Sequence, residues 1–279
     1  MTNQHNAPSI TLSNGVEMPA LGLGTWPMTD ADAEKTIPVA FEAGYRLVDS
    51  AENYRNETGV GRGIKASGID RSQVFVTTKF NVKWHSIEGA QQIWAESAKL
   101  LGLDYIDLLL IHWPNPRENR YVEAWRGMIK LLEAGKVRAI GTSNFKPAHI
   151  DRLVAETGVT PHVNQVQLNP YIPRTAERAH HAQHGIVTET WAPIAKGGNL
   201  FREAAITEIA QRLNRTPAQV VLRWHVQQGM LPIPKSSNPQ RLAENMAVFD
   251  FELTPDDIAA IDKLDQGDKG GVDSDQFGH

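Results

Sequence analysis

Short apolar runs alternate with longer amphipathic segments along most of this chain. Continuous apolar runs of this kind are typical of strands buried on both faces, as in a parallel sheet. Eight such runs are present, at positions 21–25, 46–50, 74–78, 106–111, 138–142, 163–166, 187–191 and 231–234. The pattern therefore predicts eight parallel strands.

The segments between these runs carry the start and stop signals of helices. Four of them end at or near a glycine, which is favoured just past a helix C-terminus: 30–43, 58–66, 87–101 and 122–134. Thr216 and Gln219 are spaced as a capping box, with Pro217 at the first helical position. Pro38 conflicts with the first helix, and we expect it to kink or shorten that helix.

Eight alternations of strand and helix in 279 residues predict an α/β protein with a (β/α)8 TIM barrel. The segments 9–12 and 16–18, joined at Asn14-Gly15, predict a β-hairpin ahead of the barrel. The alternative is a doubly wound sheet. However, the segment 22–27 lacks the third glycine of a G-x-G-x-x-G turn, and its Pro27 interferes with a helix there.

No linker, internal repeat or low-complexity block divides the chain. We predict a single domain over residues 1–279, with its core at about 9–265. Residues 266–279 are predicted to form a loose C-terminal loop. The sequence does not decide whether this loop covers the barrel mouth.

Charge and composition exclude several kinds of partner and site. The chain has 28 Lys and Arg against 32 Asp and Glu, so we expect no nucleic-acid partner and no anionic membrane surface. The absence of cysteine excludes disulfides, thiolate nucleophiles and cysteine metal sites. The N-terminus has no apolar signal core, and no apolar run approaches the ~20 residues of a membrane span. We therefore expect a cytoplasmic protein.

Functional side chains in such a barrel lie at the C-terminal ends of the strands. The residues that end or follow the eight runs are mostly polar or ionisable: Trp26, Asp49, Lys79, His112, Asn144, Gln165, Trp191 and Lys235. Tyr54 lies in the loop after Asp49. We expect Asp49, Tyr54, Lys79 and His112 to converge on one pocket.

These four side chains suit proton donation to a developing oxyanion. A phenol is a weak acid, with a pKa of ~10, and a lysine ammonium beside Tyr54 should make it a better one. Asp49 would keep Lys79 charged, and His112 would orient a substrate oxygen or assist the proton. The group offers no nucleophile suited to hydrolysis and no usual metal triad. It fits carbonyl reduction, in which a nicotinamide cofactor supplies the hydride.

The later strand ends offer groups that match such a cofactor. Amides and a hydroxyl suited to a carboxamide are provided by Ser143, Asn144 and Gln165. Trp191 offers a flat face for the nicotinamide ring. Near the last strand, where phosphate sites commonly lie in these barrels, stand Lys235, Ser236 and Arg241. Arg241 is placed to hold a 2′-phosphate, which favours NADPH over NADH.

Aromatic residues in the predicted loops suggest the substrate site. Trp26, Trp84 and Trp113 fall at the predicted mouth with Phe80 nearby, and such a rim favours apolar or ring-bearing small carbonyl compounds.

A histidine cluster elsewhere on the chain is interpreted differently. His180 and His184 are spaced for a metal-binding helix face, and His181 lies between them. No carboxylate or cysteine completes the site in the sequence, so we predict a helix outside the barrel and no metal.

Several segments together resemble the aldo-keto reductase family, and they lie in the family's order between residues ~10 and ~265. The segments are 44–57, 76–79, 107–114, 140–145, 164–170 and 234–245. Residues 223–225 and 248–254 are similar to those of prokaryotic members such as 2,5-diketo-D-gluconic acid reductases. The resemblance implies a monomeric barrel that reduces aldehydes and ketones with NADPH.

The resemblance also implies individual roles. Tyr54 would be the general acid, Lys79 and Asp49 its tuning pair, and His112 the orienting residue. Further positions that it assigns to the cofactor are Thr25, Trp26, Asp49, Ala192, Pro193, Ile194, Glu244 and Asn245. Ala192 and Ala195 replace the family's usual glycines, and we expect this to narrow the backbone's approach to the cofactor.

Two other functions are compatible with a barrel of this kind. Lys79 could form a Schiff base in a lyase, but that reaction needs a neutral amine, and Asp49 would hold the lysine protonated. A sensor that binds NADPH with little turnover is the other alternative, and the intact group of four residues disfavours it.

Overall fold

The computed structural model describes residues 6–278 and contains one eight-stranded parallel sheet. Its strands are β3 (Leu23–Gly24), β4 (Leu47–Asp49), β5 (Phe75–Phe80), β6 (Ile106–Ile111), β7 (Val137–Ser143), β8 (Val163–Gln167), β9 (Val187–Trp191) and β10 (Leu231–Pro232). Consecutive strands pair in chain order. The barrel closes because Gly22 and Gly24 donate their backbone N–H groups to Pro232 O and Pro234 O, at 3.1 and 3.2 Å.

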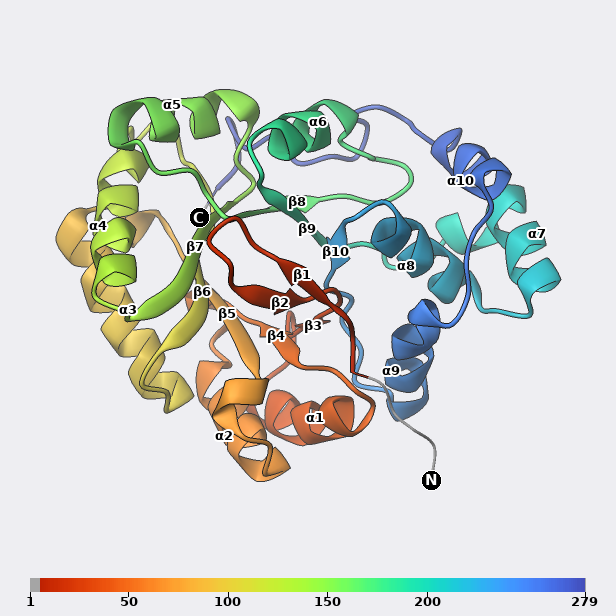
Figure 1. Cartoon of the computed structure of the whole chain (residues 1–279), viewed down its shortest axis with the longest axis horizontal. Helices are drawn as coiled ribbons and strands as arrows, with labels where there is room; N and C mark the ends of the chain where they lie inside the picture. The colour runs from red at the N-terminus through yellow and green to blue at the C-terminus, as the bar shows by residue number, and fades with distance from the viewer. Residues whose placement is uncertain (1–5, 279) are drawn as a thin grey trace.

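Helices surround this barrel, as Figure 1 shows in end view. They are α1 (Asp30–Glu42), α2 (Glu57–Ser67), α3 (Ile87–Leu101), α4 (Tyr121–Glu133), α5 (Pro147–Thr157), α6 (Thr175–Gln183), α7 (Ala204–Leu213), α8 (Pro217–Gln227), α9 (Pro239–Met246) and α10 (Pro255–Asp262). The predicted (β/α)8 barrel is confirmed, and the doubly wound alternative is wrong. No helix within residues 6–278 is long and apolar enough to cross a membrane.

The first helix is longer than its proline suggested. Helix α1 runs through Pro38 to Glu42, so the expected shortening does not occur. Thr29 and Asp32 form a capping box at its start, and the helix packs along α2. Capping and packing together outweigh the backbone hydrogen bond that proline removes.

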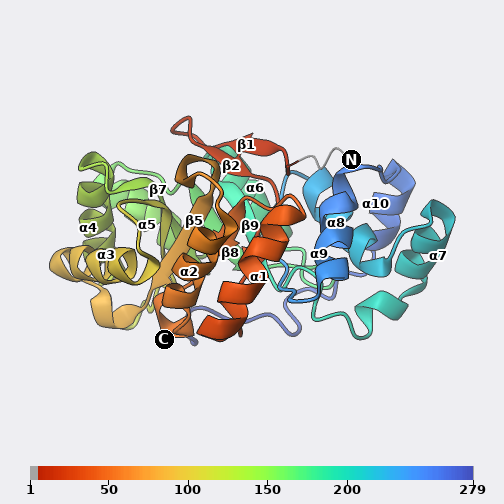
Figure 2. The ribbon, with the colours of Figure 1, turned by 90° about the horizontal axis from the view of Figure 1, so that it is seen from below.

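The N-terminal hairpin closes one end of the barrel. Strands β1 (Ser9–Thr11) and β2 (Glu17–Pro19) pair antiparallel, as predicted. Leu12 and Met18 pack against the barrel's inward apolar residues, including Leu47 and Phe75. Figure 2 shows the hairpin at one end of the barrel and the C-terminal tail at the other. The strand ends that carry polar residues therefore face away from the hairpin.

The C-terminal tail lies against this second end of the barrel. Gln167 Oε1 accepts a hydrogen bond from the Val272 backbone at 2.8 Å, and Lys146 Nζ lies 2.6 Å from Asp273 Oδ1. These contacts anchor a segment that we expected to be loose. The tail's few apolar residues gave no indication of them, because the anchoring bonds are polar and join distant parts of the chain. Residues 1–5, part of the polar N-terminus considered above, and residue 279 lie outside the described residues.

Candidate active site

Alternation along the strands gives the barrel interior an apolar end and a polar end. Inward side chains near the hairpin are apolar and include Leu47, Phe75, Val163 and Val187. Two or four residues farther along the same strands, the inward side chains are Asp49, Lys79, Gln165 and Glu189. Successive strand residues point to opposite faces, so these positions share the interior.

Lys79 and Asp49 form a buried ion pair at this polar end. Lys79 Nζ donates to Asp49 Oδ1 at 2.6 Å and to Ser50 O at 2.8 Å, and both side chains are almost wholly buried. Asp49 Oδ2 accepts from Gln165 Nε2 at 2.8 Å. Burial lowers the pKa of Lys79, but the charges of Asp49 and Tyr54 outweigh it, and the net direction is upward. This direction favours the ammonium form of the lysine.

Tyr54 lies directly beside this pair. It ends the short 3₁₀ helix Glu52–Tyr54, and Lys79 Nζ is 5.1 Å from the centre of its ring. Burial raises the pKa of Tyr54, and the opposing effect of the Lys79 charge is smaller. We expected Lys79 to make Tyr54 a stronger acid. The lysine acts in that direction, but the net pKa shift is upward because the phenolate would lose hydration in this partly buried site.

His112 completes the group of four. It follows β6, and its ring meets the Tyr54 ring edge-on at a centroid distance of 5.8 Å. Asn144 Nδ2 donates to the His112 carbonyl at 3.0 Å, which fixes the backbone at this strand end. The structure thus brings Asp49, Tyr54, Lys79 and His112 together at the mouth of the barrel.

The residues predicted to meet a nicotinamide form a hydrogen-bonded chain on the neighbouring strand ends. Ser143 Oγ donates to Gln165 O at 3.0 Å, and Asn144 Nδ2 donates to Ser143 Oγ at 3.0 Å. Trp191 Nε1 donates to Asn144 Oδ1 at 2.8 Å. Asn144 therefore orients the Trp191 ring, a role that the sequence did not predict.

The residues predicted to meet the cofactor phosphates gather at the start of α9. Lys235 and Arg241 are exposed and have no ion-pair partner within residues 6–278, and Ser236 is buried. Glu244 lies farther along α9, where its Oε1 accepts from Gln240, and Asn245 is buried on the inner side of the helix. Two unpaired cations at a helix N-terminus fit a phosphate group.

The remaining predicted cofactor residues lie next to the catalytic strands. Thr25 is buried, and its Oγ1 donates to Asp49 O at 2.9 Å. Pro193 O lies 2.9 Å from His225 Nε2, and Ile194 is half-buried. Ala192 has a φ of 49°. An alanine therefore stands in the left-handed region that favours glycine, which is consistent with its replacing a glycine.

The family model for the aldo/keto reductase family matches residues 20–266. The chain belongs to this family. It is 46% identical over 275 residues to the methylglyoxal reductase DkgA of Salmonella typhimurium, covering 98% of this chain and 99% of the relative. It is 47% identical over 262 residues to the 2,5-diketo-D-gluconic acid reductase B of a Corynebacterium species, covering 94% and 95%.

Solved structures agree with the fold of this aldo/keto reductase. The crystal structure of a mutant of Gox0644 in complex with NADPH is 41% identical, with a TM-score of 0.93, and the match covers 97% of this chain and 98% of that one. An aldo/keto reductase from Brucella melitensis is 42% identical, with a TM-score of 0.90, over 93% of this chain and 98% of that one.

Two of the predicted aromatic residues of this reductase border the catalytic group. Trp26 is 59% exposed, and its ring lies 5.1 Å from the ring of Tyr54. Trp84 is partly buried, and its Nε1 donates to Glu52 Oε2 at 3.2 Å, next to the turn that carries Tyr54. Both positions are consistent with contact between an aromatic side chain and a substrate.

The other two aromatic residues are more deeply buried. Trp113 is nearly buried, because Phe277 of the tail packs against it edge-on at 5.0 Å. Phe80 is 0% exposed and belongs to the core between the barrel and its helices. Phe80 therefore does not face the barrel mouth in the structure: it follows Lys79, so alternation turns its side chain outward.

Glu189 is a site residue that the sequence analysis missed. Its Oε2 accepts from Gln165 Nε2 at 2.8 Å, the nitrogen that also donates to Asp49. Burial raises the pKa of Glu189 to about 8, and the Asp49 charge adds to the shift. An acidic residue inside the buried run Val187–Trp191 was the signal that could have revealed it.

Replacement of Glu189 by glutamine should flatten the pH dependence of stability. Between about pH 5 and pH 8 the folded protein keeps the Glu189 proton that the unfolded chain has released, so the parent's free energy of unfolding falls as the pH rises. Glutamine is neutral at both pH values. E189Q should therefore avoid a decrease on the order of 3 kcal/mol in the free energy of unfolding between pH 5 and pH 8. Urea unfolding of both proteins at the two pH values measures the difference, and parallel pH dependence would contradict the prediction.

Proposed function

We propose that this chain reduces small aldehydes and ketones to alcohols, with NADPH as reductant and Tyr54 as proton donor. As an aldo/keto reductase it is an NADP-dependent oxidoreductase. The observation that carries the proposed roles is the buried Lys79–Asp49 pair beside Tyr54, with His112 on the other side of the tyrosine ring.

NADPH, when bound, supplies the hydride that the carbonyl carbon accepts. Ser143, Asn144 and Gln165 would hold its carboxamide and Trp191 its ring, while Lys235, Ser236 and Arg241 would hold its phosphates. The exposed, unpaired cations at the start of α9 and the donor groups on the strand ends fit a cofactor of this size and charge.

The side chains then complete the reduction. The Tyr54 hydroxyl donates its proton to the carbonyl oxygen as negative charge develops there, and the Lys79 ammonium stabilises the resulting phenolate. Asp49 keeps Lys79 protonated and in place, and His112 orients the carbonyl oxygen. The raised pKa of Tyr54 keeps the phenol protonated until it donates its proton to the carbonyl oxygen.

The substrate class follows from the site and from the relatives. Trp26 and Trp84 offer aromatic surface at the mouth, where a compact carbonyl compound would reach Tyr54. The relatives named above are reductases of methylglyoxal and of 2,5-diketo-D-gluconic acid. We propose small dicarbonyl compounds of this kind as substrates, and a single-domain monomer in the cytoplasm as the working form.

The same geometry disfavours a lyase. A Schiff base needs an unprotonated lysine, and Lys79 lies 2.6 Å from the Asp49 carboxylate.

Replacement of Tyr54 by phenylalanine should lower kcat for methylglyoxal reduction at least about a hundredfold, because general acid catalysis contributes ~10²–10⁴-fold. Binding of NADPH, measured by quenching of tryptophan fluorescence, should change less than about twofold, since Tyr54 is assigned to proton transfer. The matched control is Tyr105→Phe. Tyr105 precedes β6, at the opposite end of that strand from His112, so loss of its phenol should leave kcat unchanged. Full activity in Y54F would refute the assigned role.

Replacement of Arg241 by glutamine should raise KM for NADPH about 10- to 100-fold, as expected for loss of a charge-assisted contact with the 2′-phosphate. KM for NADH should stay nearly constant, because NADH lacks that phosphate. Arg62→Gln, an exposed arginine on α2, serves as the control. Equal effects on the two cofactors would show that Arg241 does not contact the 2′-phosphate.

A further inference from the structure

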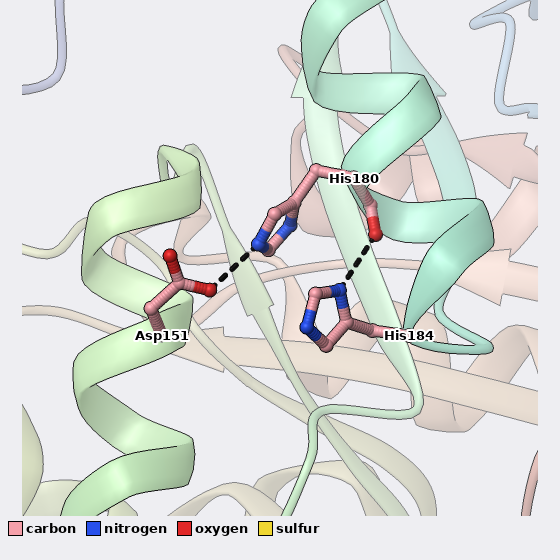
Figure 3. A group of neighbouring side chains, drawn as sticks. All are labelled: Asp151, His180 and His184. Carbon is pink, nitrogen blue, oxygen red and sulfur yellow. Dashed lines mark hydrogen bonds and ion pairs between the residues drawn. The ribbon is translucent and has the colours of Figure 1, made fainter.

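Three side chains with metal-ligand chemistry meet on the outer surface of the barrel, between α5 and α6 (Figure 3). One ligand atom from each of Asp151, His180 and His184 lies within 4.8 Å of the other two. The sequence offered the two histidines at helical spacing but no third ligand. The fold supplies the carboxylate from α5, 29 positions before His180.

Existing hydrogen bonds prepare the histidines for a cation. His184 Nδ1 lies 2.9 Å from the His180 carbonyl. A carbonyl only accepts, so Nδ1 carries the hydrogen and Nε2 keeps its lone pair. His180 Nε2 lies 2.7 Å from Asp151 Oδ1, and the two histidine rings are 4.2 Å apart between centroids. A cation would replace the proton that His180 Nε2 and the Asp151 carboxylate share.

The neighbouring Arg152 does not pair with the Asp151 carboxylate. Arg152, next in sequence to Asp151, is directed to Glu156, where its Nε donates at 2.7 Å. His181 lies within hydrogen-bonding distance of Thr188 and Asn164 through its two ring nitrogens, both at 2.9 Å, so it cannot serve as a ligand.

A second histidine–aspartate pair shows what excludes a metal. His149 Nε2 lies 3.0 Å from Asp275 Oδ1, but the Lys146 ammonium is 2.5 Å from the other oxygen of the same carboxylate. That charge already neutralises Asp275 and repels a divalent cation. The group that lies within 4.8 Å of the Asp151–His180 pair is the His184 imidazole instead of an ammonium.

We propose that Asp151, His180 and His184 form a binding site for Zn²⁺ or a similar first-row transition-metal ion that links α5 to α6. Two imidazoles and a carboxylate suit zinc, with solvent in the fourth position of a tetrahedron. In a tetrahedron, bonds of ~2.1 Å place neighbouring ligand atoms about 3.4 Å apart. The Asp151 side chain is 57% exposed, so it can rotate to reach that spacing.

Zinc titration of untagged, chelator-treated full-length protein tests the site. Calorimetry with ZnCl₂ should show one ion bound per chain, both with and without NADPH. His180→Asn and His184→Gln should each weaken the affinity at least tenfold, and Asp151→Asn should weaken it less. Affinity should also fall as the pH falls, because protons compete for the imidazole nitrogens.

The control is His149→Gln, which removes the histidine of the other pair and should leave zinc binding unchanged. All variants should keep the parent's carbonyl reduction, which shows that they are folded. The visible spectrum of bound Co²⁺ gives an independent measure, and it should lose its four-coordinate bands in H184Q. Absence of binding at millimolar zinc, or equal affinity in the His180→Asn/His184→Gln double variant, would overturn the proposal.

Discussion

A buried ion pair, Lys79 with Asp49, is the interaction on which the site depends. A buried ion pair is stable only when the two charged groups are well oriented and their remaining polar atoms form hydrogen bonds. Here the ammonium also donates to Ser50 O, and the carboxylate also accepts from Gln165. The pair thus anchors three strands, and it places a fixed positive charge beside Tyr54. The same contacts that stabilise the pair inside the barrel hold the positive charge in the place that the proposed stabilisation of a phenolate requires.

The barrel can hold such a pair because strand alternation divides its interior. Apolar side chains and the hairpin close one end, so water reaches the polar side chains only from the other end. Low hydration accounts for the upward shifts in the pKa of Tyr54 and Glu189. Both shifts favour the neutral forms of these two groups near pH 7. Burial also raises the pKa of Asp49, but the Lys79 charge opposes that shift, and Asp49 is the carboxylate that pairs with Lys79. A neutral phenol next to a fixed ammonium is the state required before proton donation.

Local patterns were sufficient to predict the barrel and the convergence of Asp49, Tyr54, Lys79 and His112. The strands at Ile106–Ile111 and Val187–Trp191 have the predicted bounds, because each is a continuous apolar or alternating run. The first and last strands of the barrel, β3 and β10, are shorter than predicted. In β10 this follows because Pro232 and Pro234 have no N–H group to donate to a neighbouring strand. Phe80 lies in the core and not at the mouth, because alternation turns the residue after the inward-facing Lys79 to the outer face of the strand. The tail contacts and the carboxylate beside His180 join distant segments through polar groups, and no periodicity encodes such contacts.

The most direct test of the central claim is a double-mutant cycle on the ion pair, Asp49→Asn with Lys79→Met. The free energy of unfolding and kcat are measured for the parent, both single variants and the double variant. D49N alone leaves a buried ammonium without a partner and should lose about 3–5 kcal/mol of stability. The double variant should be more stable than D49N, since the unpaired charge is gone, yet it should still lack turnover. Additive stability losses, or turnover in the double variant near that of the parent, would contradict the account.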